Sequence, residues 1–341
     1  MKILLIKLSA IGDVVQTLPA LEAIKKLYPA SEITWIVEEA AADILEGHPM
    51  IDRVLVSRRK ALTRMLKNPR TFMRGLDGII RFFRELRATQ YDIAVDFQGL
   101  FKSGILVGLT RAKRKIGFYG TREFSYLFLN ERLPVYDLEK HALERYLDVA
   151  RYLGAHDPAP TCTLPIEHEI SRMRQRTADI KEAGKPLVVI NPVARWKTKL
   201  WGESSFAELA DRLVLEKKAA VIFTGSVADR DVNQRIIARM KQAAENWAGE
   251  TSLKELAALA ALSDLFITTD TGPMHLAAAT GAKVLALFGP TAPWRTGPYG
   301  TSAVIVRTGI ECSPCFKRKC EDNVRCMEGI SVEDVMSKIA G

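Results

Sequence analysis

Short apolar segments alternate with amphipathic ones along this chain of 341 residues, and this alternation constrains the fold more than any other feature. KILLIKL at 2–8 precedes the amphipathic VVQTLPALEAIKKLYP at 14–29, and the strand-like segments EITWIVEE and YDIAVDF follow at 32–39 and 91–97. Strands that alternate with helices build parallel sheets of βαβ units. The sequence therefore predicts an α/β fold with doubly wound sheets.

The alternation breaks off and restarts near the middle of the chain. Residues 156–165, HDPAPTCTLP, are rich in proline. The apolar segments beyond them are PLVVINP at 186–192, AAVIFTG at 219–225, DLFITT at 264–269 and KVLALFGP at 283–290. Because a chain of this length is enough for two ordinary domains, we predict two Rossmann-like domains, residues 1–160 and 161–341, that face a central cleft.

The composition is typical of a soluble globular protein, with 48% hydrophobic and 26% charged residues. No apolar run approaches the ~20 residues that span a bilayer. The N-terminal apolar run is short, contains Lys7 and ends in Gly-Asp, which is not typical of a signal peptide. We therefore expect a first strand there and a cytoplasmic protein.

The chain has a net charge of +9, and the positive charge is most concentrated in one segment. Residues 58–87, RRKALTRMLKNPRTFMRGLDGIIRFFRELR, hold ten basic and two acidic side chains. Such a segment suits an anionic membrane surface, an anionic substrate or a nucleic acid. A solvated basic helix face explains it equally well, so the charge pattern alone leaves these alternatives open.

The loops that follow the expected strands are the candidate site, because ligands of doubly wound sheets bind beyond the carboxyl ends of the strands. These loops are LSAIGD, FQGLFK, NPVARWKTKLW, TGSVAD, TTDTGPMH and FGPTAPW. None carries G-x-G-x-x-G or G-x-x-x-x-G-K-[ST], which argues against a nicotinamide dehydrogenase and a P-loop nucleotidase. The remaining expectation is an anion-binding site built without these motifs.

The segment DTGPMH at 270–275 has the residues of a phosphate-binding helix start. Thr271 is a candidate N-cap, Gly272 permits close backbone approach, and Pro273 fits the first helical turn. Free N–H groups at such a start bind phosphate oxygens, and His275 one turn later can add a hydrogen bond. A well-capped helix with a core histidine explains the same residues equally well.

Three further loop residues carry charges that suit a reaction of a sugar diphosphate. Lys199, between two tryptophans, is placed to neutralise a leaving diphosphate, and Asp229 follows a glycine turn where a carboxylate can hold ribose hydroxyls. Asp13 is a candidate general base for an acceptor hydroxyl. The plainer explanations are a solvated lysine, an acid at a helix start and, favoured for Asp13 on position alone, an N-cap.

Four of the five cysteines lie close together in CSPCFKRKCEDNVRC, at Cys312, Cys315, Cys320 and Cys326. The C-x2-C pair is typical of zinc sites, but the following spacings match no common zinc finger. A possible metal site and a reduced structural cluster in a loop are therefore both retained, with the reduced cluster favoured.

The chain resembles the lipopolysaccharide heptosyltransferases, glycosyltransferase family 9 of the GT-B fold, in segments that run in order from residue 1 to about 327. These segments are KLSAIGDVVQTLPAL, DFQGLFKSG, NPVARWKTKLWGESSFAELADRL, DTGPMHLAAATGAKVLALFGPTAPWRTGPYG and CSPCFKRKC. The resemblance implies transfer of heptose from ADP-heptose to Kdo or to the first heptose of the inner core. It also implies inversion at the anomeric carbon, with no metal and no other cofactor.

The resemblance assigns roles to individual residues. By this resemblance, Asp13 is the catalytic base and Lys199 assists the donor diphosphate. The donor-binding residues that it implies are Thr251 and Ser252 near the adenine, Asp229 at the nucleoside in place of the family's Glu, and Asp270, Thr271, Gly272 and His275 at the heptose and diphosphate.

The implied acceptor is anionic and linked to lipid, which gives the basic segment a purpose. We expect a protein peripheral on the inner face of the inner membrane, with Lys102 among its acceptor-binding residues. No nucleic-acid partner is expected, because the chain has no recognised nucleic-acid-binding motif.

Two alternatives stay open at this point. Another GT-B enzyme of nucleotide sugars, such as an epimerase, would share the diphosphate site but need no lipid-linked acceptor. Within the family, the element Q-G-x-x-K-S favours the enzyme that adds heptose to Kdo, whereas the cysteine tail favours the one that adds to heptose. The first is slightly preferred.

Overall fold

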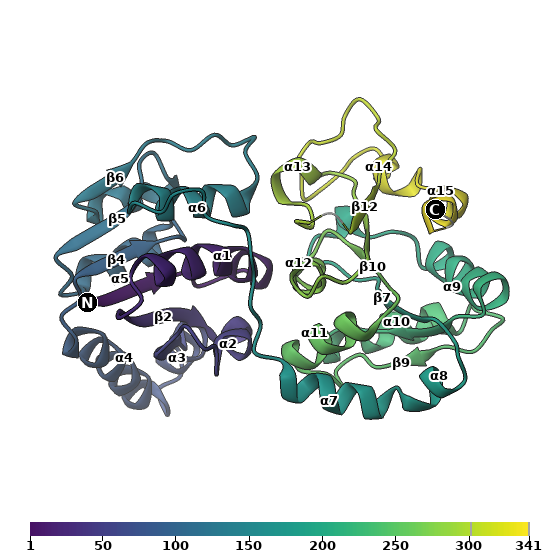
Figure 1. The fold of residues 1–341 in the computed structure, drawn as a ribbon, viewed down its shortest axis with the longest axis horizontal. Coiled ribbons are helices and arrows are strands. Elements are labelled where there is room, and N and C mark those ends of the chain that lie inside the picture. Colours follow the sequence, from purple (N-terminus) through teal and green to yellow (C-terminus); the bar gives the residue numbers. More distant parts are fainter. Residues whose placement is uncertain (301, 340–341) are drawn as a thin grey trace. The chain divides into compact units, whose positions relative to one another are not determined.

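The computed structural model describes residues 1–300 and 302–339 and divides into two compact units, Met1–Pro165 (unit 1) and Ile166–Gly341 (unit 2). The division falls at Pro165, five residues beyond the boundary at residue 160 that is predicted from the sequence. Each unit contains one six-stranded parallel sheet with helices along it (Figure 1). The prediction of an α/β fold with two doubly wound sheets is therefore confirmed.

The sheet of unit 1 has the order β3-β2-β1-β4-β5-β6. Its strands are β1 (Lys2–Ile6), β2 (Glu32–Glu38), β3 (Arg53–Ser57), β4 (Ile93–Asp96), β5 (Arg114–Phe118) and β6 (Glu131–Leu133). In the register of the central pairs, Ile6 lies opposite Ile36 of β2 and Asp96 of β4. The strand order reverses between β1 and β4, and ligands bind at such a switch point beyond the carboxyl ends of the strands.

The helices of unit 1 are α1 (Ile11–Leu27), α2 (Glu39–Leu45), α3 (Arg59–Leu66), α4 (Phe72–Ala88), α5 (Phe101–Leu109) and α6 (Ala142–Tyr152), with the 3-10 segment η1 (Arg122–Phe128). In β1, the side chains of Ile3 to Ile6 are completely buried. This burial explains the unbroken apolar run in the sequence, because parallel strands are covered by helices on both faces. The polar residues that follow the run are left at the edge of the sheet, where the site of unit 1 forms.

The sheet of unit 2 repeats the pattern with the order β12-β11-β10-β7-β8-β9. Its strands are β7 (Leu187–Asn191), β8 (Ala220–Phe223), β9 (Glu245–Asn246), β10 (Leu265–Thr269), β11 (Val284–Leu287) and β12 (Ala303–Val306). The order reverses between β7 and β10, where Thr268 lies opposite Asn191. The loops after these two strands therefore flank the switch point of unit 2.

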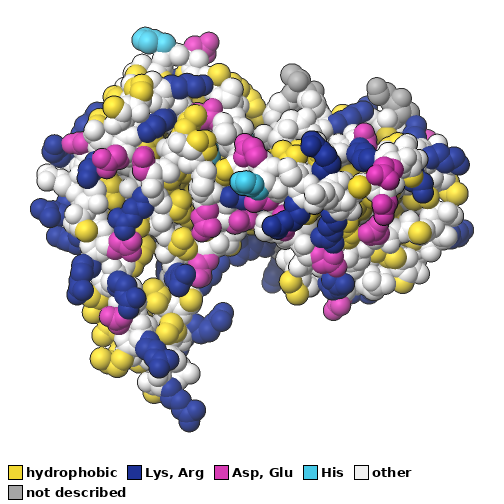
Figure 2. All heavy atoms as spheres, turned by 60° about the horizontal axis from the view of Figure 1, so that its bottom comes forward, with side chains coloured by type: hydrophobic (Ala, Val, Ile, Leu, Met, Phe, Trp, Pro, Cys, Tyr) yellow, Lys and Arg dark blue, Asp and Glu magenta, His cyan; other side chains and the backbone are white. Residues whose placement is uncertain are grey.

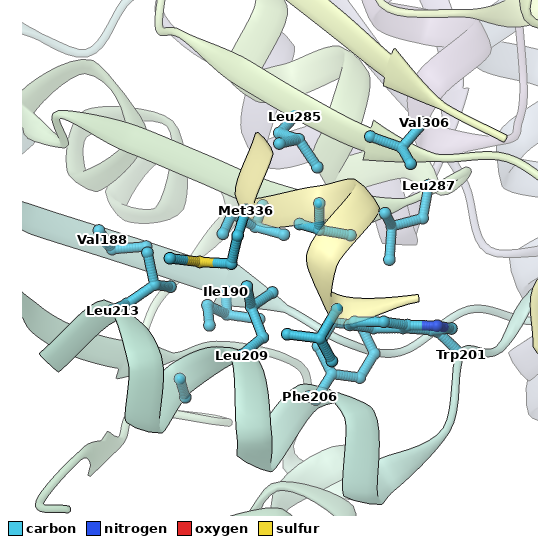
Figure 3. Packing of buried hydrophobic residues seen from close by; sticks show 14 of the residues in the cluster. Val188, Ile190, Trp201, Phe206, Leu209, Leu213, Leu285, Leu287, Val306 and Met336 are labelled. Atoms are coloured by element: carbon cyan, nitrogen blue, oxygen red, sulfur yellow. The ribbon is translucent and has the colours of Figure 1, made fainter. Parts of the chain in front are cut away.

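The helical segments of unit 2 are α7 (Glu167–Arg176), α8 (Ala178–Glu182), η2 (Lys197–Lys199), α9 (Glu203–Lys217), η3 (Val227–Asp229), α10 (Arg230–Ile237), α11 (Leu253–Leu262), α12 (Gly272–Ala279), α13 (Pro293–Thr296), α14 (Arg325–Glu328) and α15 (Val332–Ile339). A buried apolar cluster joins the sheet to α9 and α15 (Figure 3). Trp201 lies in this cluster with its ring edge-on to Phe206 at 4.9 Å, and its Nε1 donates to the Ile330 carbonyl at 2.9 Å. This contact fastens the segment before α15 to the start of α9.

None of the described helices is both long enough and apolar enough to cross a membrane.

Candidate active site

Asp13 lies in the first turn of α1, directly beyond the carboxyl end of β1. The helix begins at Ile11, so Asp13 is its third residue and not the N-cap considered from the sequence. Its Oδ2 accepts a hydrogen bond from the Ala10 amide at 3.1 Å, and its Oδ1 accepts one from the Tyr146 hydroxyl at 3.3 Å. The carboxylate is partly exposed. It is therefore held at both oxygens and still accessible to a ligand.

A buried lysine stands behind this carboxylate. Lys7 is 3% exposed, and its Nζ donates to the Tyr146 hydroxyl at 2.7 Å and to the Phe97 carbonyl at 3.1 Å. Burial lowers the pKa of the Lys7 ammonium, while the charges of Asp13 and Asp96 act in the opposite direction. Since the Tyr146 oxygen accepts from Lys7, its own proton is directed to Asp13. The chain Lys7–Tyr146–Asp13 thus fixes the orientation of the carboxylate.

The end of β4 supports the same loop from the other side. Oε1 of Gln98 accepts the amides of Leu8 and Ser9, each at 3.0 Å. Asp96 in turn accepts the amides of Gln98 and Gly99 at 2.9 and 3.0 Å. Burial raises the pKa of the Asp96 carboxyl to about 6, although these hydrogen bonds oppose the shift. A polar cavity of about 70 Å³ lies here, lined by residues that include Lys7, Asp96 and Tyr146.

Lys102, at the start of α5, does not project freely into solvent. Its Nζ donates to Oε1 of Glu38 at 2.9 Å and to the Ser9 hydroxyl at 3.2 Å. Arg59 and Lys60 approach the same Glu38 carboxylate at 3.5 and 3.7 Å. Burial tends to raise the pKa of Glu38, but the hydrogen bond and charge of Lys102 and the two neighbouring cations lower it. Three cations therefore surround one carboxylate close to the loop that precedes Asp13.

In unit 2, the centre of the site is a partly buried ion pair. Lys199 Nζ lies 2.5 Å from Oδ2 of Asp270, and the two side chains are 16% and 6% exposed. The Thr291 hydroxyl donates to the same Oδ2 at 2.6 Å. The Lys199 ammonium also lies 4.7 Å from the centre of the Trp196 ring, which adds a cation–π contact. Asp270, which capping does not explain, therefore positions Lys199.

The start of α12 differs in one respect from the capped helix considered from the sequence. Thr271 occupies the N-cap position with extended backbone, but its side chain makes no capping hydrogen bond. Gly272 and Pro273 form the first turn, and His275 is buried, 8% exposed, one turn in. The helix start thus lies directly beside the Lys199–Asp270 pair, because Asp270 immediately precedes its N-cap.

The remaining donor-site candidates already take part in local capping. Asp229 accepts the amide and the hydroxyl of Ser226 at 2.8 and 2.6 Å, and a Cβ at Gly225 would lie only 2.8 Å from Asp229. Ser252 caps α11: its hydroxyl accepts the Glu255 amide at 3.2 Å, and Glu255 accepts the Ser252 amide. Thr251 is partly exposed before this cap. The turn with Asp229 follows β8, and the turn with Thr251 and Ser252 precedes α11, so the two turns belong to separate loops.

The four C-terminal cysteines are brought together, and none forms a disulfide. Cys312, Cys315, Cys320 and Cys326 all line a small cavity of about 20 Å³. Among the described residues, however, no group of three or more His, Cys, Asp or Glu side chains is arranged to hold a metal ion. The possible metal site is therefore not supported here. The cysteine loop packs against the site instead. Its Lys317 carbonyl accepts a hydrogen bond of 2.9 Å from the hydroxyl of Thr198, the residue before Lys199.

Sequence reasoning did not single out four residues of these sites. Lys7 and Asp96 could have been found from the sequence, because each is a charged residue within an apolar run, KILLIKL or YDIAVDF, and charged side chains are rarely buried. Thr291 lies in the candidate loop FGPTAPW, but nothing in its spacing links it to Asp270. Tyr146 lies on α6, more than a hundred residues from Asp13 in sequence, and its role depends on the packing of α6 against α1.

Two doubly wound parallel sheets, each followed by loops with polar and charged residues, are the architecture of GT-B enzymes of nucleotide sugars, a class that includes many glycosyltransferases. The family model described as glycosyltransferase family 9 (heptosyltransferase) matches residues 79–324. The chain is also 33% identical over 326 residues to lipopolysaccharide heptosyltransferase 1 of Pseudomonas aeruginosa, covering 94% of this chain and 87% of that protein. This chain belongs to glycosyltransferase family 9 and is a heptosyltransferase of lipopolysaccharide core biosynthesis.

Solved structures agree on the fold. The glycosyltransferase family 9 protein of Veillonella parvula superposes with a TM-score of 0.85 at 24% identity, covering 99% of this chain and 96% of that one. The Escherichia coli heptosyltransferase WaaC, solved with ADP, gives 0.79 at 23% identity, with 100% and 99% covered. At these identities the likeness establishes the GT-B fold alone.

Proposed function

We propose that this heptosyltransferase moves heptose from ADP-heptose to the inner core of lipopolysaccharide by a single inverting displacement, with Asp13 as general base. The observation that carries the proposal is the Asp13 carboxylate, partly exposed at the switch point of unit 1 and hydrogen-bonded at each oxygen. A base must be oriented and accessible to take a proton from an attacking hydroxyl. This arrangement meets both needs.

The hydrogen bonds to Asp13 suit the proton transfer. Tyr146 and Ala10 each use one lone pair of the carboxylate, and the other lone pairs accept the proton of the acceptor hydroxyl. As that proton leaves, the acceptor oxygen attacks the anomeric carbon of the donor. The bond from this carbon to the diphosphate breaks on the opposite face, so the configuration inverts.

The leaving group is ADP, and unit 2 supplies its charge stabilisation. In an oxocarbenium-like transition state, negative charge moves onto the diphosphate. Lys199 and the first turn of α12, with Thr271, Gly272 and His275, are the groups that we assign to this charge. Asp270 holds Lys199 through Oδ2, and we assign its Oδ1 to a heptose hydroxyl. These protein groups then stabilise the negative charge of the leaving diphosphate, which a metal ion stabilises in other transferases.

The nucleoside half of the donor is assigned to two neighbouring turns. Asp229 serves the ribose hydroxyls, and Thr251 and Ser252 lie near the adenine. Asp229 already accepts two hydrogen bonds from Ser226 through Oδ2. We therefore assign the ribose to its other oxygen. The roles of Asp229, Thr251 and Ser252 are those that the resemblance to glycosyltransferase family 9 implies.

For the acceptor, we propose Kdo in preference to the first heptose. The relative that is 33% identical bears the name lipopolysaccharide heptosyltransferase 1, and the element Q-G-x-x-K-S favours the same choice. Kdo carries a carboxylate, and Lys102, Arg59 and Lys60 together exceed the single charge of Glu38 by two. This net positive charge, close to Ser9 and the Asp13 loop, suits an anionic acceptor.

We also propose that the enzyme is cytoplasmic and works peripherally on the inner face of the inner membrane. Its acceptor is anchored there by lipid, and residues 58–87, which form α3 and α4, carry ten basic side chains against two acidic ones. Anionic lipid attracts such a segment by about 1 kcal/mol per basic residue near the surface.

The function is tested with purified protein, ADP-heptose and two acceptors, Kdo-lipid A and the same lipid with one heptose attached. We expect heptose transfer to Kdo-lipid A and release of one ADP per heptose. Transfer only to the heptosylated lipid would overturn the choice of acceptor. An epimerised sugar that appears with donor alone, and no transfer to either lipid, would favour the epimerase alternative.

A further inference from the structure

The helices α3 and α4 are amphipathic, yet they bury little of their apolar faces. No residue of α3 is buried, and only Gly75 and Leu86 are buried in α4. Phe72, Met73 and Ile80 are 45%, 71% and 46% exposed. In Figure 2, yellow hydrophobic side chains lie among dark blue Lys and Arg side chains at the lower left, over unit 1. Amphipathic helices of this kind with basic flanks lie in membrane interfaces.

Two glycines of α4 hold α3 close to it. A Cβ at Gly78 would lie 2.5 Å from Cδ2 of Leu62, and a Cβ at Gly75 would lie 3.0 Å from Cβ of Met65. The two helices therefore form a tightly packed hairpin. Ile79, Phe82 and Phe83 of the hairpin, together with Ile105 and Leu106 of α5, line a space between the hairpin and α5.

An apolar cavity of about 220 Å³ occupies that space. Its apolar lining consists of Leu62, Ile79, Phe82, Phe83, Ile105 and Leu106, together with Leu8 from the loop after β1. Apolar cavities of about 150 Å³ stay dry and bind small hydrocarbons. This cavity is larger and open to solvent, but its lining is mainly apolar, so an apolar guest that displaces water from it is favoured.

The mouth of the cavity is positively charged. Arg58, Arg59 and Lys102 also line it, and Lys60 lies beside Arg59. The carboxylates that pair with these cations are Glu38 and Glu39, so four positive charges face two negative ones. The Arg58 and Arg59 side chains are 69% and 50% exposed. A guest with an apolar chain and an anionic head matches both parts of the site.

We propose that the α3–α4–α5 cavity binds one acyl chain of an anionic membrane phospholipid, with the phosphate at the Arg58–Arg59 mouth. The chain contacts Leu62, Ile79 and the two phenylalanines, while the exposed apolar side chains of α4 rest in the same membrane surface. This site anchors the enzyme through a lipid that is not its substrate. The inference does not depend on the proposed chemistry, since neither Asp13 nor Lys199 contributes to the site, but Arg59 and Lys102 are shared with the proposed acceptor site.

The test measures binding of single-chain lipids below their critical micelle concentration by calorimetry, with no transfer reaction. The probes are oleoyl-lysophosphatidylglycerol, which is anionic, oleoyl-lysophosphatidylcholine, which is zwitterionic, and glycerol phosphate, which is the head alone. We expect saturable binding of one anionic lipid per chain, at least tenfold weaker binding of the zwitterionic one, and none of the head alone. Equal binding of the two lipids, or displacement of lipid by glycerol phosphate, would overturn the proposal.

Two variants locate the site. Ile79→Trp fills the cavity and should weaken binding of the anionic lipid at least tenfold, whereas Met73→Ser, on the exposed side of α4, should leave it unchanged. Equal weakening by both would point to loose adsorption on α4 and would overturn the cavity. If Ile79→Trp melts early, hydrogen exchange of the wild-type protein decides: the lipid should slow exchange in α3 and α4, and unchanged exchange there would contradict the site.

Discussion

At the scale of single residues, the pair Lys199–Asp270 shows how a charge is kept ready for a leaving group. Burial of a lone ammonium is costly, and the nearby carboxylate at 2.5 Å offsets that cost. Thr291 and Trp196 then restrict the geometry. The ammonium is therefore already in place when charge develops on the diphosphate. Groups that are fixed in advance in this way stabilise a transition state well, because they need not reorganise during the reaction.

Replacing Lys199 tests this assignment. Lys199→Met keeps the length of the side chain but removes the charge, so we expect kcat to fall by about 10²–10³-fold, as for other lost transition-state donors. The matched control is Lys197→Met, in the same turn but exposed, which should stay near the wild-type rate. Steady-state kinetics with ADP-heptose measure both, and equal losses in the two variants would contradict a specific role for Lys199.

Asp96 gives a prediction about pH. Its pKa in the folded protein, about 6, lies above the ordinary value of 3.8, so the folded state retains a proton between these values that the unfolded state has lost. The free energy of unfolding should therefore decrease as pH rises from about 4 to about 6, by about 3 kcal/mol in full. Asp96→Asn stays neutral and still accepts the Gln98 and Gly99 amides, so it should lack this decrease.

Denaturant titrations of both proteins at pH 4.5 and pH 7 measure this difference. The variant should gain stability relative to the wild type as pH rises. A constant difference between the two proteins at both pH values would show that Asp96 does not hold a proton in the folded state.

The residues found from the sequence share one property: each lies in the loop or helix start that follows a strand. Asp13, Lys199, Asp229 and the 270–275 segment could be found because strand ends of doubly wound sheets are a known place for ligands. Tyr146 and Thr291 could not, because their roles arise only when distant segments pack together. Asp270 was found, but its salt bridge to Lys199 depends on how two loops meet and has no signal in the sequence.

At the scale of elements, the central strands could be predicted and several outer ones could not. β7 and β10 are buried along their whole length and β1 is buried except at Lys2, and all three strands are mainly apolar in sequence. The edge strands β6 and β9 have only three and two residues, too few to show a pattern. The basic segment forms the two helices α3 and α4, and its membrane contact stays a proposal.

The attachment of the C-terminal elements gives a prediction at this scale. Trp201→Phe keeps an aromatic ring beside Phe206 but leaves the buried Ile330 carbonyl without its donor. We expect a loss of about 1–3 kcal/mol in the free energy of unfolding. Trp294→Phe, at a half-exposed site, should cost less than about 0.5 kcal/mol. Denaturant unfolding measures both, and equal effects would show that the hydrogen bond contributes little.

At the scale of the whole molecule, the division into two units separates the proposed tasks. The base lies in unit 1, whereas the groups assigned to the donor lie in unit 2. The repeat of the strand–helix alternation along the sequence was sufficient to predict two doubly wound sheets. The family match then supplies what neither sheet shows by itself, namely that the sugar transferred is a heptose.

The most direct test of the central claim is the transfer rate of Asp13→Ala with ADP-heptose and Kdo-lipid A, measured beside its affinity for ADP. Because Asp13 belongs to unit 1 and ADP is assigned to unit 2, the variant should bind ADP as the wild type does. Its transfer rate should fall by about 10²–10⁴-fold, the usual contribution of a general base. Transfer near the wild-type rate by a folded Asp13→Ala protein would contradict the mechanism.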